Sequence, residues 1–208
     1  MEAEDVPTQL ASYTISELSK VAAGRAVEAL RYSDIEDGDW ADSELDYWKG
    51  TLEEMGFQNP KIRYSGFSSQ GDGASFTSAY VDLGMFLVAV GDAQRFRLLT
   101  LAEKLEFELR LVVKEVGDGR YSHKYTVRAS IEDFIRCDQK GLRDRVDDLI
   151  DELEERTTEV VREMSDKIYA GLDKEYTYLV SDDAVVENIA ARGYLFTEGG
   201  ARVEGVSA

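Results

Sequence analysis

Alternating apolar and polar residues mark two β-hairpins in the middle of the chain. In the first hairpin, residues 61–67 and 74–80 alternate on either side of a stretch rich in glycine and serine. In the second, residues 106–116 and 121–127 alternate around a Gly-Asp-Gly turn at 117–119. Together the two hairpins predict an antiparallel sheet of about four strands, a common sheet size.

Apolar residues spaced three or four apart predict helices before the sheet. One such run starts near Ile15, with Ser16 or Ser19 as the candidate N-cap. A second run follows an acidic stretch and ends at Gly56, a residue suited to a left-handed C-terminal cap. Between the hairpins, the apolar run 81–90 is compatible with either a strand or a buried helix.

A very long helix is predicted after the sheet. Its apolar stripe runs from Leu142 to Leu179, nearly forty residues, and lapses at Arg156 and Thr157. The lapse marks either a bend or the point where one half of the helix projects beyond the sheet. Packing on a core is favoured over a coiled coil, because the stripe is not a regular heptad.

The chain is predicted to end in a short helix and a hairpin. Ser181 precedes two acidic residues and is the candidate N-cap, and Gly193 closes this helix before a hairpin at 194–203. The predicted fold class is therefore α+β, with an antiparallel sheet covered by helices, a long C-terminal helix and a small helix–hairpin tail. Its predicted divisions are a flexible arm at 1–12, an α+β domain at 13–180 and the tail at 181–208.

The net charge of the chain limits the classes of molecule that it is expected to bind. The 208 residues include 24 Lys and Arg against 42 Asp and Glu, which gives a formal net charge of −18. Such a chain disfavours direct binding to nucleic acid or anionic membranes, but it suits a basic protein, including one whose basic groove holds nucleic acid. A single cysteine, Cys137, an acidic N-terminus and the lack of a long apolar run predict a cytoplasmic protein.

The Gly-rich loop between the first two strands is the least ordinary stretch. One interpretation is a nest of backbone N–H groups for an anion such as phosphate, although the carboxylate of Asp72 opposes it. The alternative is turn chemistry, with Phe67 and Phe76 packed under the loop. The candidate ligand-binding residues are Ser65, Ser68, Ser69, Gln70, Gly71, Asp72, Gly73, Ser75 and His123.

His123 is the only histidine in the chain, so a catalytic role is considered for it first. Its neighbours Tyr121 and Tyr125 are expected on the same face of a strand, where the imidazole serves as a general base, as a ligand contact or simply as a half-exposed strand residue. A hydrolase would have to use Asp72 and His123. Since no nucleophile elbow or metalloprotease motif is present, the sequence favours a non-enzymatic protein, and no catalytic residue is assigned.

An acidic stretch precedes the first hairpin, between Asp34 and Glu54. Its spacing does not match a calcium loop, so neither a metal nor a cofactor is expected. The candidate partner-binding residues are Asp34, Glu36, Asp37, Asp39, Asp42 and Glu44.

Several segments carry a family resemblance: SGFSSQGDGASF at 65–76, YTISELSKVAAGRAVE at 13–28, GRYSHKYTV at 119–127 and SDDAVVENIAARGYLFTEGG at 181–200. They are similar to a family of small acidic phage and prophage proteins, often labelled antitoxins of toxin–antitoxin stability systems. A Trp often stands in that family where this chain has Ser68. The resemblance brings no established reaction, and it favours a helix at 81–90, continuing through 92–104 after a break near Gly91.

Three functions follow as hypotheses. The first is an antitoxin-like or anti-defence phage protein that binds and inhibits a host or defence-system factor through its acidic surface. The second is a protein that binds a nucleotide or another small signal at the Gly-rich loop, and the third is the hydrolase described above. The sequence leaves open whether the protein is a monomer or a homodimer.

Overall fold

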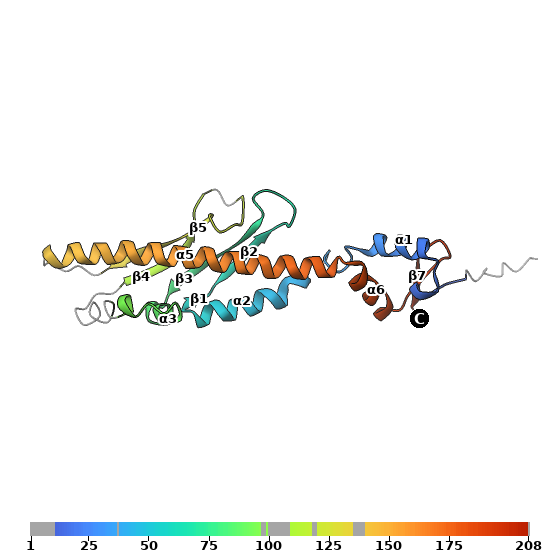
Figure 1. Ribbon diagram of the computed structural model, residues 1–208, viewed down its shortest axis with the longest axis horizontal. Helices are drawn as coiled ribbons and strands as arrows, with labels where there is room; N and C mark the ends of the chain where they lie inside the picture. The colour runs from blue at the N-terminus through green and yellow to red at the C-terminus, as the bar shows by residue number, and fades with distance from the viewer. Residues whose placement is uncertain are drawn as a thin grey trace, which may run out of the picture. The chain divides into compact units, whose positions relative to one another are not determined.

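A computed structural model describes residues 11–36, 38–96, 99, 109–117, 120–134 and 140–207, apart from the side chains of residues 133–134, 140–146 and 205–207. Asp37, Cys137, residues 1–10 of the predicted arm and most of 97–108 lie outside this description. The elements, most of which are labelled in Figure 1, are η1 (Ile15–Glu17), α1 (Lys20–Leu30), η2 (Asp39–Ala41), α2 (Asp42–Glu54), β1 (Phe57–Gln58), β2 (Lys61–Ser65), β3 (Gly73–Val81), α3 (Leu83–Ala89), β4 (Leu109–Glu115), β5 (Val127–Phe134), α5 (Lys140–Leu179), α6 (Asp182–Ala191), β6 (Tyr194–Phe196) and β7 (Arg202–Ser207). The protein is α+β, as the sequence predicts.

The main sheet is antiparallel and is built around β3. β4 pairs with one edge of β3 and with β5, while β1 and β2 share the other edge of β3. β1 and β2 follow one another along that edge, because the left-handed Asn59 (φ 51°) and the next residue, Pro60, interrupt a single strand path. The sheet thus has four rows of strands, and the prediction of about four is confirmed.

One face of the sheet forms the core with α3 and α5. Phe57 packs edge-on against Phe76 and Phe86, with ring centroids 5.1 and 5.6 Å away. The 81–90 run is largely helical, as the family resemblance favours, because the Asp82 side chain accepts a hydrogen bond from Met85 N (2.9 Å) and starts α3. Gly91, in a left-handed conformation (φ 70°), ends that helix, as predicted.

α5 is one unbroken helix through the predicted lapse at Arg156 and Thr157, so the lapse marks no break in the helix. Two of its polar side chains cap the edge strand β5: Glu154 Oε1 accepts from Ile131 N (2.6 Å) and Thr158 Oγ1 accepts from Ala129 N (3.1 Å). Open N–H groups at a sheet edge are a template for unwanted pairing. The apolar stripe of α5 therefore lapses where the helix contacts the edge of β5 in addition to the core.

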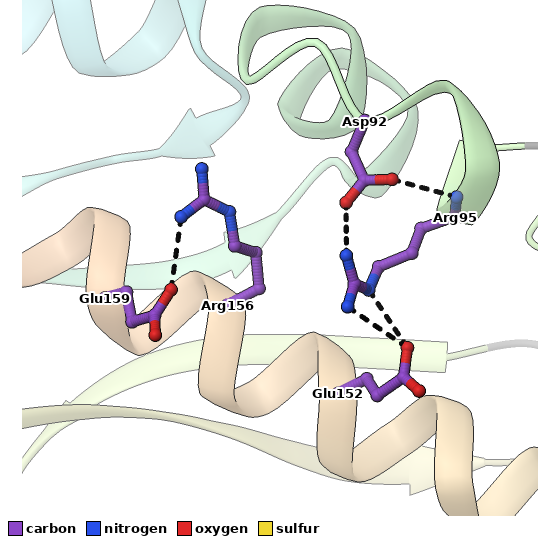
Figure 2. A network of polar contacts seen from close by, with 5 residues as sticks. All are labelled: Asp92, Arg95, Glu152, Arg156 and Glu159. Atoms are coloured by element: carbon purple, nitrogen blue, oxygen red, sulfur yellow. Dashed lines mark hydrogen bonds and ion pairs between the residues drawn. The ribbon is translucent and has the colours of Figure 1, made fainter.

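A charged cluster joins the segment after α3 to α5. In Figure 2, the Arg95 guanidinium lies between Asp92 and Glu152, and it bonds Glu152 Oε2 through Nε at 3.2 Å. On the next turn of α5, Arg156 contacts Glu159 at 3.1 Å. The contacts between Arg95 and Glu152 tie α5 to the segment after α3, whereas the Arg156–Glu159 pair lies within α5.

The chain divides into two compact units, residues 1–40 with 174–208, and residues 41–173. In the first unit, Ser181 caps α6, as predicted, and Ser19, one of the two predicted candidates, caps α1. Its buried cluster consists of Ile15, Ala26, Val27, Val185, Ile189 and Phe196. This grouping differs from the predicted division at residue 181, because the N-terminal helix packs on the tail helix and hairpin.

Candidate functional site

A hollow of about 290 Å³ lies in the second unit where the Gly-rich loop, residues 120–126 and α5 meet. Its walls are Gly71, Asp72, Gly73, Ala74, His123, Lys124, Tyr125, Asp166 and Tyr169. Four predicted ligand-binding residues, Gly71, Asp72, Gly73 and His123, thus come together around one space. That space is near the lower end of the usual range for small-molecule sites, roughly 300–1,000 Å³.

The backbone around His123 is a turn, and the predicted strand from Tyr121 to Val127 is wrong for all but its last residue. Thr126 N donates to His123 O (2.8 Å), and Thr126 Oγ1 donates to the same oxygen (2.7 Å). These bonds fold the segment back, so β5 starts only at Val127. The alternating tyrosines here belong to a turn instead of a sheet face.

His123 has a defined orientation. Tyr125 N donates to His123 Nδ1 (3.1 Å), so the neutral imidazole carries its proton on Nε2. The rings of Tyr121 and Tyr125 lie 6.5 and 6.0 Å from the imidazole, and the two residues are 57% and 61% exposed. The turn therefore presents two exposed tyrosine rings beside a half-buried imidazole that has a ring N–H donor.

Asp72 fills the nest that the sequence offered to an external anion. Its Oδ2 accepts hydrogen bonds from Ser68 N (2.9 Å) and Ser69 N (2.6 Å). Gly66 lies so close that a Cβ there would come within 2.6 Å of the same oxygen. The loop is therefore not an open nest for an external anion, because its N–H groups already donate to the chain's own carboxylate.

The remaining loop candidates lie outside the walls of the hollow. Ser65 Oγ contacts Ser122 O at 3.5 Å, Ser75 is buried, and Ser68, Ser69 and Gln70 are exposed. Phe67 does not pack under the loop with Phe76. It stacks on Tyr169, with centroids 5.5 Å apart and planes at 16°, whereas Phe76 belongs to the core of the sheet.

Five wall residues are not among the predicted ligand-binding candidates: Ala74, Lys124, Tyr125, Asp166 and Tyr169. Lys124 Nζ bonds Asp166 Oδ2 at 2.6 Å, and this hydrogen bond raises the pKa of Lys124 above its usual value. The Lys124 ammonium and the Arg162 guanidinium lie 5.4 and 5.2 Å from the Tyr125 ring centroid.

Tyr169 closes the α5 side of the hollow. Its hydroxyl donates to Gly66 O (3.3 Å), so it holds the Gly-rich loop against the helix. Burial raises the pKa of Tyr169, and the negative charges of Asp72 and Asp173 raise it further. The phenol therefore stays protonated and keeps this hydrogen bond at neutral pH.

The acidic partner-binding candidates are divided between the two compact units. Residues 34–36 and Asp39 precede α2, which begins only at Asp42, and the two units divide between Trp40 and Ala41. Asp34 is held by Arg192 (2.6 Å), Glu44 accepts from Trp48 Nε1 (2.8 Å), Glu36, Asp39 and Asp42 are exposed, and Asp37 lies outside the described residues.

Within the described ranges, no group of three or more His, Cys, Asp or Glu residues is arranged to hold a metal ion. No helix in that part of the chain is both long and apolar enough to cross a bilayer.

Comparison with protein families matches residues 40–182 to a domain of unknown function, DUF8835. Searches of curated proteins and of solved structures found no match. The matched region contains the whole second unit, and hence the hollow.

Proposed function

This chain belongs to the DUF8835 family, and we propose that it is a binding protein that takes a small, flat, hydrogen-bonding ligand in the hollow beside His123. A nucleobase or nucleoside is the prototype of such a ligand. The observation that carries the proposal is the meeting of the Gly-rich loop and the only histidine, distant in sequence, around one hollow with Lys124, Tyr125, Asp166 and Tyr169.

The chemistry of the walls supports a flat polar ring. Tyr125, Tyr169 and His123 supply aromatic surface, which bases and other planar rings stack on. The imidazole Nε2–H is a donor, and the Lys124–Asp166 pair offers both a donor and an acceptor. A volume of about 290 Å³ holds a base or nucleoside but not a dinucleotide.

Recognition led by a phosphate group is less well supported. The loop N–H groups that would bind phosphate are bonded to Asp72, and the hollow carries a second carboxylate, Asp166. The same bonds give Asp72 a structural role, which removes the carboxylate that a hydrolase using His123 would need. Both arguments favour a binding site for an uncharged ring.

Because the chain has one histidine, its imidazole C–H signals in NMR report on this site alone. Adenosine and uridine are the probes, with AMP for comparison. Saturable movement of the His123 signals with a nucleoside, lost in Tyr125→Ala, is the expected result. Tyr47→Ala is the matched control, since Tyr47 is 63% exposed on α2 and should leave binding unchanged. Flat titrations with all three probes would remove the proposal.

A second candidate is that a phage-encoded form acts in the host cytoplasm and blocks a basic host or defence protein. The exposed carboxylates of Glu36, Asp39 and Asp42 and the net charge of −18 favour it. Affinity purification from infected or lysogenic cells should then recover a stoichiometric basic partner. Reversing these three charges to Lys should release that partner, whereas Glu53→Lys with Glu54→Lys should not. Retention by the triple variant would exclude these three carboxylates as the contact.

A further inference from the structure

The sheet face turned away from the core carries a row of cations. Lys61 pairs with Thr77 and Lys114 with Arg128, and the pairing of Ser78 with Val113 sets Thr77 beside Lys114. Directly opposite residues share a face, so Lys61, Lys114 and Arg128 line up across the sheet. These three residues, the basic row, span about 14 Å at three strand spacings of about 4.8 Å.

This face is far more basic than the rest of the chain. Arg63 and Arg110 extend the basic row along their strands, which brings the number of exposed cations to five. Among the described side chains, Glu115 neutralises Arg63, Glu132 lies 3.7 Å from Lys114, and Glu154 of α5 lies 3.6 Å from Arg128, so five cations face three carboxylates. In a chain with 42 acidic and 24 basic residues, such a surplus of cations is unexpected by composition. Arg128 remains 62% exposed and Lys114 51%.

An acidic stripe adjoins the basic row. Asp147, Asp151, Glu155 and Glu159 are exposed on α5 at intervals of four residues and run about 18 Å along one side of the helix. Like charges at this spacing destabilise a helix. Three of the four, together with Arg128, line one groove of about 450 Å³, so the acidic stripe borders the basic row.

We propose that this surface binds a second copy of the same chain, with the basic row of each copy on the acidic stripe of the other. Adjacent patches of opposite sign and similar length are self-complementary, because a two-fold axis brings each onto its opposite in the partner. The observations favour a second copy over nucleic acid, since a net charge of −18 repels phosphate backbones and the acidic stripe lies directly beside the cations.

Salt concentration gives this dimer an unusual signature. At about 0.01 M salt, charges act over roughly 30 Å, so two chains of −18 repel as whole bodies. At about 0.1 M the range falls to about 10 Å, and contacts between the patches outweigh the overall repulsion. At about 1 M the contacts are screened too. Sedimentation equilibrium of the full chain should therefore show the tightest dimer at intermediate salt.

Complementary charge variants test the pairing. Lys61→Glu with Lys114→Glu, and separately Asp151→Lys with Glu155→Lys, should each weaken self-association about tenfold or more. Mixing the two variants should restore a 1:1 dimer, which also shows that both are folded. As controls, Lys20→Glu with Arg25→Glu and Glu53→Lys with Glu54→Lys make the same charge changes on α1 and α2 and should leave the dimer intact.

Two outcomes would overturn the proposal. One is a wild-type protein that stays monomeric across the whole salt series. The other is a monomer that binds a single-stranded oligo-dT probe through Lys61 and Lys114, which would assign the face to a polyanion instead of a second copy.

Discussion

Gly73 lies so close to His123 that a Cβ on residue 73 would come within 2.7 Å of the His123 Cβ. The start of β3 therefore packs directly on the turn that carries the imidazole. Gly73→Ala should displace this turn, lower the free energy of unfolding by about 1–3 kcal/mol and move the His123 NMR signals. Gly50→Ala is the control, because a Cβ there meets nothing within 4 Å in α2 and should stabilise by about 1 kcal/mol. A Gly73→Ala protein with wild-type stability and signals would contradict the close packing.

Asp72 organises its loop by accepting from two backbone N–H groups. Asp72→Ala should speed hydrogen exchange at Ser68 and Ser69 about tenfold or more and cost about 1–3 kcal/mol, because both donors lose their acceptor. The emptied nest should also gain affinity for inorganic phosphate, which the wild type should not bind there. Unchanged exchange at both serines would show that the carboxylate is not what holds the loop.

The sequence predicts most of the fold, because its elements follow from local patterns. The apolar stripe of α5 and the caps at Ser19 and Ser181 depend on neighbouring residues alone. The prediction of the returning strand of the second hairpin is wrong, because a side-chain hydrogen bond overrides the local pattern. Its alternation continues through residues 121–126, but the hydroxyl of Thr126 bonds His123 O and forms a turn that the polarity pattern does not reveal.

The candidate site is predictable in part. The Gly-rich loop and His123 stand out by composition and rarity, and they do meet around the hollow. Asp166 and Tyr169 come from α5, where a charged or aromatic residue on a solvated helix face is ordinary. Their role depends on the place where the helix crosses the loop, and tertiary packing alone decides that.

Acid should weaken the cluster around Asp92. A hydrogen bond from Arg95 N, together with the bond and charge of the Arg95 guanidinium, lowers the pKa of Asp92 despite partial burial. Because the folded pKa lies below the unfolded value of about 3.9, the stabilisation is complete above that pH and is lost as pH falls through the folded pKa. Urea unfolding of Asp92→Asn should therefore differ from wild type by a constant amount between about pH 5 and 8, and the difference should shrink below about pH 4.

Arg95→Gln separates the contributions to this effect. It removes the guanidinium but keeps the backbone N–H donor, so part of the acid dependence should remain. A difference between wild type and Asp92→Asn that is the same at pH 3 and pH 7 would mean that the carboxylate's charge does not stabilise the cluster.

Neighbouring threonines on α5 should respond with opposite sign to the same substitution. Thr157 is fully buried, and its Oγ1 has no hydrogen-bond partner in the part of the chain that the structure describes. Thr157→Val replaces that hydroxyl with a methyl group of similar shape and should stabilise by about 1 kcal/mol. Thr158→Val removes the acceptor of Ala129 N at the edge of β5 and should destabilise by about 1–2 kcal/mol. Since both changes put the same β-branched residue into the same helix, helix propensity cancels, and urea unfolding reads the hydrogen bonding alone. Equal shifts for the two variants would mean that the Thr158 bond does not hold the strand edge.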